Sequence, residues 1–249
     1  MKRLLLVACQ LAALSVLLQG CSLWGFGGWE RAQWRHDAEA QCISSGRLHL
    51  SEYVTEGRPT SDGDCGADHP FRVQAVSNGM VGLSEVALLN CPMTVAMDDW
   101  VEKVVQPQAA AMIGQPVVAL KLLGSYTCRR IADAHSMSEH AYMNAIDIAG
   151  FKFADGREIL IRRDWSGDDP VAAQFLRAVG DRSCEIFNTV LGPDYNADHR
   201  DHFHLDLAAR LRSHRRICKG GPMHEGPMSY GPPVFTGSLQ SKIDEASED

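Results

Sequence analysis

The amino-acid sequence predicts an α+β fold, a single domain in which helices pack on an antiparallel sheet. Two longer segments repeat their apolar residues at helical spacing, and several shorter ones are rich in β-branched and aromatic residues. A hairpin signal, Asp155-Gly156, separates two of the short segments and indicates antiparallel pairing. The chain has 249 residues, 45% of them hydrophobic, which is enough for one core. Its net charge of −7, with no strong basic patch, argues against nucleic acid as a partner.

Residues 1–20 predict a secretory signal peptide. A short basic start precedes an apolar run at residues 4–18, which is too short to cross a membrane. The run ends in Leu-Gln-Gly before Cys21 and resembles a bacterial lipobox, which implies cleavage before Cys21 and a lipid on that cysteine. Ser22 then favours the outer membrane over the inner one. The sequence therefore predicts a periplasmic protein with a lipid anchor; an ordinary signal peptide that leaves Cys21 free is the alternative.

Six cysteines remain after the signal peptide and the lipid site. An even number in an exported chain predicts disulfides, and the sequence leaves their pairing open. No Cys-x-x-Cys pair is present to favour metal ligation by thiolates instead. The six residues are Cys42, Cys65, Cys91, Cys128, Cys184 and Cys218.

The N-terminal part, residues 21–64, is expected to hold a lipid tether and one helix. Residues 57–69 are rich in Gly, Asp, Ser and Pro and predict a loop. The helix is expected within residues 29–44, with three candidate apolar contacts: Trp34, Ala38 and Ile43.

The main domain is expected to span residues 65–218. An alternating strand is predicted at residues 71–76, followed by a helix at residues 94–112 that Pro107 should kink or split. Residues 117–123 predict a buried strand.

The second half of this domain begins with a predicted strand at residues 146–153. The turn at Asp155-Gly156 leads to a return strand at residues 158–161. An amphipathic helix is expected over residues 171–190. Within this helix, Gly180 is a weak point because glycine costs about 1 kcal/mol relative to alanine.

The chain ends in a strand and a tail. Residues 202–207 predict the final strand. Residues 219–249 are first rich in Gly, Pro and Met and then acidic, and their lack of periodicity predicts disorder.

Two short segments gather side chains that suit a metal ion. His202 and His204 are two residues apart, so they point to the same face if this segment is a strand. His140 precedes the strand predicted at residues 146–153, and Asp147 falls within it. Burying such groups unpaired among apolar neighbours costs several kcal/mol, and a bound metal relieves that cost.

Two imidazoles and one carboxylate suit Zn²⁺, so the antiparallel sheet is expected to carry a zinc site. Three protein ligands leave a fourth position for water, as in catalytic zinc sites. The remaining imidazole, His202, lies beside the metal and can handle protons. Asp201 and Asp206 flank the histidine pair. Asp206, on the same strand face as His204, is a candidate hydrogen-bond partner for a ligating histidine.

Four stretches resemble the bacterial extensin-like C-terminal domain proteins: residues 124–129, 138–151, 191–196 and 199–207. The specific elements are a Ser-x-His-x-x-x-x-Ala-x-Asp motif and a later His-x-His pair. These proteins are similar in turn to the zinc D-Ala-D-Ala carboxypeptidases and murein endopeptidases, a group that includes Hedgehog-type and lysostaphin-type folds. The resemblance covers residues 65–218 and implies an extensin-like, zinc peptidase-like domain.

This resemblance implies roles for individual residues. His202 would act as general base or transition-state stabiliser, and Ser138 would lie at the substrate-binding edge. An arginine, either Arg129 or its neighbour Arg130, would bind a substrate carboxylate or the oxyanion. Met143 is bulkier than the glycine that the peptidases have near this position, which implies a different substrate groove. The implied zinc ligands are His140, Asp147 and His204.

These features predict a zinc-dependent lipoprotein peptidase that hydrolyses peptidoglycan stem peptides or cross-links in the periplasm. Two other classes of function stay open. One is a non-catalytic zinc-containing module that binds peptidoglycan or a protein partner, and the other is a structural envelope lipoprotein without a metal. His202 separates the peptidase from the zinc-containing binding module, since a binding module needs the three ligands but no further imidazole beside them.

Overall fold

A computed structural model describes residues 31–59, 63–131, 136–210 and 216–220 of the chain. These residues belong to one compact unit. None of the helices in this part of the chain is long and apolar enough to cross a membrane. The predicted signal peptide, the lipid site at Cys21, the tether up to residue 30 and the tail from residue 221 lie outside the described residues.

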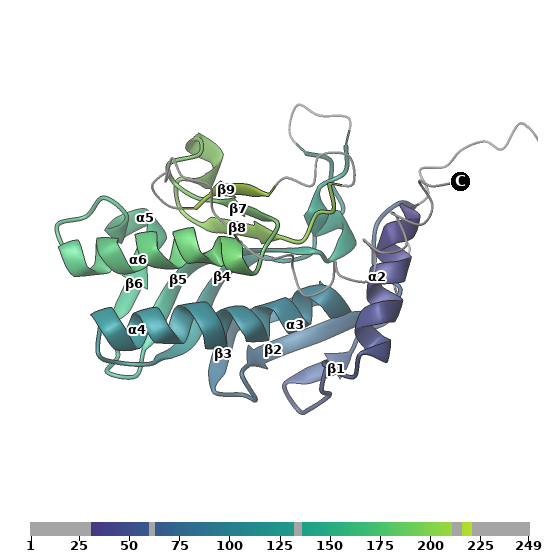
Figure 1. Cartoon of the computed structure of the whole chain (residues 1–249), viewed down its shortest axis with the longest axis horizontal. Coiled ribbons are helices and arrows are strands. Elements are labelled where there is room, and N and C mark those ends of the chain that lie inside the picture. The colour runs from purple at the N-terminus through teal and green to yellow at the C-terminus, as the bar shows by residue number, and fades with distance from the viewer. Residues whose placement is uncertain (1–30, 60–62, 132–135, 211–215, 221–249) are drawn as a thin grey trace, which may run out of the picture. The chain divides into compact units, whose positions relative to one another are not determined.

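All the strands of the described residues join one sheet (Figure 1), in the order β1-β2-β3-β4-β5-β8-β7-β9, with β6 paired to β5. The pairs β3–β4 and β7–β9 are parallel, and the other pairs are antiparallel. The sheet is therefore mixed, and the expectation of an antiparallel sheet holds for most pairs only. The strands are β1 (Val54–Glu56), β2 (Pro70–Val76), β3 (Val81–Asn90), β4 (Val117–Gly124), β5 (Ala145–Phe153), β6 (Glu158–Leu160), β7 (Thr189–Leu191), β8 (Phe203–Asp206) and β9 (Ile217–Lys219).

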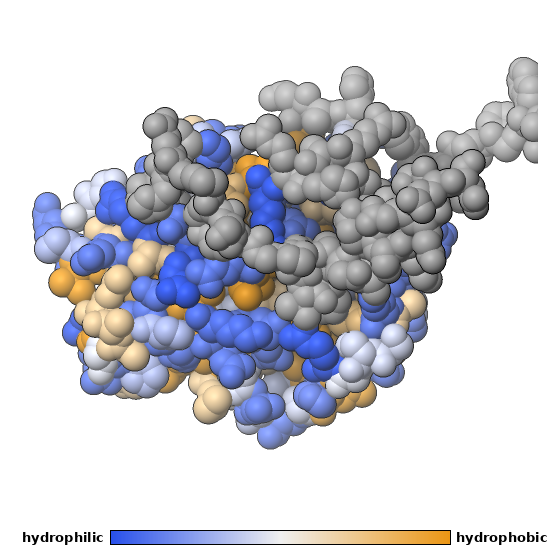
Figure 2. Space-filling view, viewed as in Figure 1, coloured by the Kyte–Doolittle hydropathy of each residue, from blue (hydrophilic) through white to orange (hydrophobic). Residues whose placement is uncertain are grey.

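Helices cover one face of this sheet. In Figure 1, the α3–α4 helical segment and α6 run side by side in front of the strands, and α2 lies near the β1 edge. Between α3 and α4 the chain forms a π-helical segment, Val101–Val105, just before Pro107. The outer surface of these helices is mostly hydrophilic in the middle of this face (Figure 2), as expected for helices that bury one stripe. The helices are α2 (Gln33–Ser44), α3 (Cys91–Trp100), α4 (Gln106–Met112), α5 (Ile161–Asp164) and α6 (Pro170–Arg182).

A cluster of aromatic rings fills the space between the helices and the sheet. Phe151 of β5 meets Phe175 of α6 edge to face, with ring centroids 5.2 Å apart. Trp100 packs on Phe151 and Phe187, and its indole nitrogen donates a hydrogen bond of 2.8 Å to the Ser183 hydroxyl. Such buried rings contribute large apolar areas, and the Trp100–Ser183 bond satisfies the one polar atom that the indole brings into the core.

Several predicted elements match the structure, and others end elsewhere. The predictions are correct for β2 and β5. They are also correct for the long helix at residues 94–112, which is split into α3 and α4. β4 alternates buried and exposed residues rather than being buried throughout, because only one face of the sheet is covered there. α6 ends at Arg182, eight residues early, and the chain then forms β7, which pairs with β8 and β9.

Four strands, β7 among them, and one burial pattern were not predicted correctly. β1 and β3 were missed, and β8 is not the final strand because β9 follows it and includes Lys219. The helix α2 buries Glu39 and Cys42, whereas Ile43 is 42% exposed. Glu39 is buried because it forms an ion pair with Arg31 and accepts the backbone N–H of His69.

The prediction that the six cysteines form disulfides is confirmed. The bonds are Cys42–Cys91, Cys65–Cys128 and Cys184–Cys218. The first ties α2 to α3, and the last ties the chain after α6 to β9. Cys65–Cys128 joins two irregular segments that flank the 3₁₀ turn described below.

Gly180 in α6 allows a close approach rather than acting as a weak point. A Cβ atom at this position would overlap the carbonyl oxygen of Gly220 and would also press on the ring of Phe203. The glycine therefore lets the chain after β9 pass directly against the helix.

We expect Gly180→Ala to lower the free energy of unfolding by about 1–3 kcal/mol, because the added methyl group has no room. Helix propensity alone predicts the opposite sign, a gain of about 1 kcal/mol. Urea denaturation measures the difference. Gln174→Ala, at an exposed position of the same helix, is the control and should change stability by less than about 0.5 kcal/mol. A Gly180→Ala protein more stable than wild type would contradict the packing described here.

Candidate metal centre

The three predicted ligands come together at one end of the sheet. Asp147 of β5 lies directly opposite His204 of β8 in the antiparallel register, which places both side chains on one face. His140 comes from the 3₁₀ turn Glu139–Tyr142, just before β5. These three side chains form a group that could hold a metal ion.

The distances within this group fit tetrahedral coordination. His204 Nδ1 lies 3.1 Å from His140 Nε2 and 3.1 Å from Asp147 Oδ1. His140 Nε2 lies 3.3 Å from Asp147 Oδ1. In a tetrahedral site with metal–ligand bonds of about 2.0–2.1 Å, neighbouring ligand atoms are about 3.3–3.4 Å apart. The three atoms therefore need to separate by only a few tenths of an ångström to bind an ion of this kind.

The far side of each imidazole fixes which nitrogen faces the group. His140 Nδ1 donates to the backbone carbonyl of Ser125 at 2.6 Å, which leaves the lone pair of Nε2 for the centre. His204 Nε2 donates to Asp206 Oδ2 at 2.9 Å, which leaves Nδ1 for the centre. Three acceptor atoms this close repel one another unless a cation lies among them. A metal ion or a proton among the three atoms would remove this repulsion.

The pKa values show where that proton lies in the metal-free protein. Burial would lower the pKa of His204, but its hydrogen bonds with Asp147 and Asp206 outweigh burial and raise the pKa to about 10. Burial would raise the pKa of Asp147, yet its hydrogen bonds with His140 and His204 hold it far below the usual range. The pKa of Asp206 is lowered against burial by the same contact with His204. A His204 imidazolium between two carboxylates thus stands in for the metal.

His202 lies next to the group and one residue before β8, not within the strand as expected. Its Nε2 is 3.6 Å from Asp147 Oδ1, and its Nδ1 is 2.9 Å from Asp201 Oδ1. A carboxylate can only accept a hydrogen bond, so His202 Nδ1 carries the proton that it donates to Asp201. The Nε2 lone pair of the neutral ring then points toward the three candidate ligands. Each of the two flanking carboxylates therefore has a histidine partner: Asp206 contacts the ligand His204, and Asp201 contacts His202.

The turn that carries His140 is capped by Ser138. The Ser138 hydroxyl accepts the backbone N–H of His140 at 3.3 Å, and Ser138 is buried. The turn ends at Met143 in the left-handed region, with φ 54°. The structure thus gives Ser138 a role in shaping the turn, and its predicted contact with substrate stays a prediction.

Side chains from distant segments hold this turn in place. Arg35 of α2 forms two hydrogen bonds of 2.7 Å with the Glu139 carboxylate, and its guanidinium lies 3.7 Å from the Tyr142 ring centroid. Asn144 donates to Glu139 at 2.7 Å and accepts from Asn90 at 3.0 Å. Asn90 also caps α3, so the position of His140 depends on both α2 and α3.

Arg129 is not brought into the group. Its side chain is exposed and donates to the backbone carbonyl of Arg130 at 3.4 Å. Among the described residues, no hydrogen bond or ion pair joins Arg129 to the three candidate ligands or to His202. Its backbone carbonyl accepts the N–H of Ser138 at 3.0 Å, so the residue lies beside the turn.

One histidine near the group had no predicted role. The His199 ring lies 5.3 Å from that of His202 and 6.0 Å from that of His204, and Tyr195 packs on its other side. Burial and the two neighbouring histidines lower the pKa of His199 to about 4. The spacing His-x-x-His-x-His from His199 to His204 is the signal that could have identified it. His135, a further histidine near the motifs, lies outside the described residues.

Comparison with known proteins gives one match. A family model described as "Extensin-like protein C-terminus" matches residues 40–219. The match includes the three candidate ligands, His202 and all six disulfide-bonded cysteines. The search of curated proteins found no match, and neither did the search of solved structures.

We expect Asp206→Asn to weaken metal binding by about 10–100-fold, because the carboxylate orients His204 and raises its basicity. Asp201→Asn is the matched control. It removes the same charge beside a histidine that is not a ligand, so the metal affinity should stay within about threefold of wild type. Competition with a chromophoric chelator measures both affinities. Equal losses in the two variants would contradict the assignment of His204 as the ligand.

We expect metal binding at pH 7 to release about one proton per ion. His204 is protonated at this pH because its pKa is about 10, and only neutral imidazole binds a metal. The release should disappear as the pH rises above about 10, where the ring is already neutral. Calorimetric titrations in two buffers with different ionisation enthalpies measure the number of protons. A binding enthalpy at pH 7 that is the same in both buffers would contradict this charge assignment.

Proposed function

This chain belongs to the extensin-like protein C-terminus family, and on that premise we propose that it is a zinc-dependent peptidase acting on peptidoglycan. The proposed reaction is hydrolysis of a peptide bond in a stem peptide or cross-link. The single observation that carries the proposal is the convergence of His140 Nε2, Asp147 Oδ1 and His204 Nδ1, with a third imidazole, that of His202, beside them. The proposed kinship with zinc D-Ala-D-Ala carboxypeptidases and murein endopeptidases rests on the order and spacing of these residues.

The donor set supports zinc as the metal. Two imidazole nitrogens and one carboxylate oxygen match the ligands of catalytic zinc sites, and hard cations such as Mg²⁺ and Ca²⁺ prefer oxygen alone. When bound, Zn²⁺ supplies a Lewis acid that polarises a carbonyl and makes water a better nucleophile at neutral pH. His140, Asp147 and His204 would hold it, and Ser125 and Asp206 would keep the two imidazoles in the required orientation.

His202 is the proposed general base. Its Nε2 faces the space beside the three ligands, and Asp201 holds its other nitrogen in the protonated state. The Nε2 lone pair can accept a proton from the attacking water and later return it to the leaving amine. His202 is mostly buried, so its ring is held in place by its surroundings. A binding module needs no such group.

Negative charge on the reacting carbonyl or on a substrate carboxylate calls for a cation. Arg129 is the proposed residue, with Arg130 as the alternative, because both lie on the exposed segment that precedes the turn with Ser138 and His140. Within the described part of the chain, the hydrogen bond of the Arg129 side chain goes to the backbone of Arg130, so this role requires the side chain to turn toward a bound substrate. Ser138 opens the same motif, and we propose from the resemblance alone that it lies at the substrate-binding edge.

The proposed location is the periplasm, with a lipid on Cys21 in the outer membrane. Three disulfides within the described residues support an oxidising compartment, because cytosolic proteins rarely keep them. An anchored enzyme there faces the peptidoglycan layer. The alternative is a zinc-containing module that binds peptidoglycan or a protein without cleaving it, which would need the three ligands but neither His202 nor an arginine at the metal.

We expect the chain from Ser22 onward to bind one zinc ion and to release fragments from purified peptidoglycan. His202→Ala should keep the ion and lower the rate of release by about 10²–10⁴-fold, the usual contribution of a general base. Mass spectrometry measures the zinc, and chromatography of the released muropeptides measures cleavage.

The matched control is His69→Ala, which removes an exposed histidine outside the site and should cleave as wild type does. One zinc ion in every variant with no cleavage by any would favour the binding module. Absence of zinc from the wild type would overturn both readings.

A further inference from the structure

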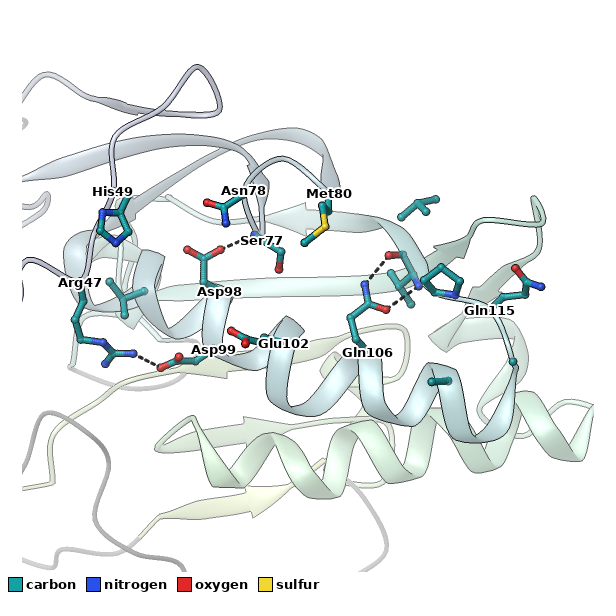
Figure 3. Close-up of a pocket in the computed structure, with 16 residues that line it drawn as sticks. Arg47, His49, Ser77, Asn78, Met80, Asp98, Asp99, Glu102, Gln106 and Gln115 are labelled. Carbon is teal, nitrogen blue, oxygen red and sulfur yellow. Dashed lines mark hydrogen bonds and ion pairs between the residues drawn. The ribbon is translucent and has the colours of Figure 1, made fainter.

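A concave site lies at the opposite end of β4 from the candidate metal centre. It is a groove between the α3–α4 helical segment, the turn that joins β2 to β3, and the start of β4 (Figure 3). We call it the helix groove. Val117 lines it at one end of β4, whereas Gly124 at the other end pairs with Asp147. Seven residue steps at about 3.3 Å each separate the two by roughly 23 Å, so the helix groove is a separate site.

The size and walls of the helix groove suit a small organic group. Its volume is about 870 Å³, within the range of ligand pockets. Apolar side chains form much of its lining: Met80, Val95, Val117 and Val118. Met80 is 70% exposed at the mouth, and a flexible methionine there can adapt to a bound chain.

The charge in the helix groove is negative and partly uncompensated. Asp99 is neutralised by Arg47 at 2.6 Å and Lys103 at 2.7 Å. Asp98 and Glu102, one helical turn apart, have no ion-pair partner among the described residues. Burial raises the pKa of Asp98, and the charges of Asp99 and Glu102 act in the same direction. A cation placed between Asp98 and Glu102 would relieve this repulsion.

The helix groove is also lined by side chains that can donate hydrogen bonds, namely Arg47, His49, Asn78 and Gln115, of which Arg47 binds Asp99. Both ends of the Gln106 amide bind the backbone of Val117, at 2.7 and 3.0 Å. The backbone N–H of Ser77 donates to Asp98 at 2.7 Å, which fixes that carboxylate at the centre of the groove (Figure 3). Asp98 and Glu102 are the charged groups of the lining without an ion-pair partner among the described residues, and they lie beside apolar side chains. A ligand that matches them has hydrogen-bond donors, a positive charge and an apolar stem.

We propose that the helix groove binds a primary ammonium group on an alkyl stem, as in a lysine-type side chain of a peptide. The ammonium lies between Asp98 and Glu102, and the methylene groups lie along Met80 and Val118. Long amine side chains bury their stems on apolar surface in this way while the charge meets an acceptor. A divalent cation fits less well, because Ca²⁺ and Mg²⁺ require six or more oxygen ligands and most of the groove is apolar.

The test is a titration of the ¹⁵N-labelled full chain with the peptide acetyl-Ala-Lys-Ala-amide, followed by NMR at pH 7.5. We expect saturable shifts of the backbone amides of Ser77, Met80 and Asp98. The same peptide acetylated on its side-chain amine should bind at least about tenfold more weakly, because it loses the charged hydrogen bonds. Glu102→Gln should weaken binding by a similar factor, because it removes one of the two carboxylates that bind the ammonium. The fold should be kept, since the Glu102 side chain is exposed and glutamine has the same size.

The matched control is Glu85→Gln, which removes the same charge from an exposed position on β3 and should leave the affinity unchanged. His204→Ala should also leave it unchanged, which separates this site from the metal centre. Equal binding of the acetylated peptide would overturn the proposal. So would the absence of shifts at these amides, the same shifts with CaCl₂ alone, or shifts that depend on protein concentration and therefore report a second copy of the chain.

Discussion

Three lone pairs that point at one spot are the constraint on which the metal centre depends. His140 Nε2, Asp147 Oδ1 and His204 Nδ1 approach to 3.1–3.3 Å, and their other bonds prevent them from turning away. The Ser125 carbonyl and the Asp206 carboxylate each bind the far nitrogen of one imidazole. Such an arrangement is stabilised by a positive charge, which either a metal ion or the extra proton of a His204 imidazolium could supply. The high pKa of His204 has the same cause, because the carboxylates of Asp147 and Asp206 stabilise a positive charge on its ring.

The support for this centre comes from much of the domain. Asp147 and His204 are positioned by strand register, which is set by the whole sheet. His140 depends instead on a polar chain from Arg35 through Glu139 and Asn144 to Asn90, which links two helices to one turn. Because these side chains are satisfied by one another, the turn is held more tightly than an exposed loop would be. The first elements of the domain therefore help to shape a site whose ligands come later in the sequence.

The sequence predicted the parts of the fold that carry strong local signals. The β5–β6 hairpin has a turn signal, the ligand set has a distinctive spacing, and the even cysteine count indicated disulfides but not their pairing. β3 was missed because the exposed stretch around Ser84 and Glu85 interrupts its alternation. The end of α6 was misplaced because Ile186 and Phe187 continue the helical spacing, although the chain leaves the helix at Arg182. The hydrogen bonds of Asp201, Asp206 and Arg35 depend on tertiary contacts that no local pattern encodes.

The position of β8 has a consequence for the order of events in folding. β8 lies between β5 and β7, although both precede it in the chain. Since β7 reaches β5 only through β8, His204 meets Asp147 when β8 pairs with β5, a step that closes a long loop. All three ligands come together only after that pairing, so we expect an ion that needs all three to bind after β5 and β8 have met. An interaction absent from the transition state acts mainly on the reverse reaction. A bound ion would thus preserve the folded chain by slowing its unfolding, with little effect on how fast it forms.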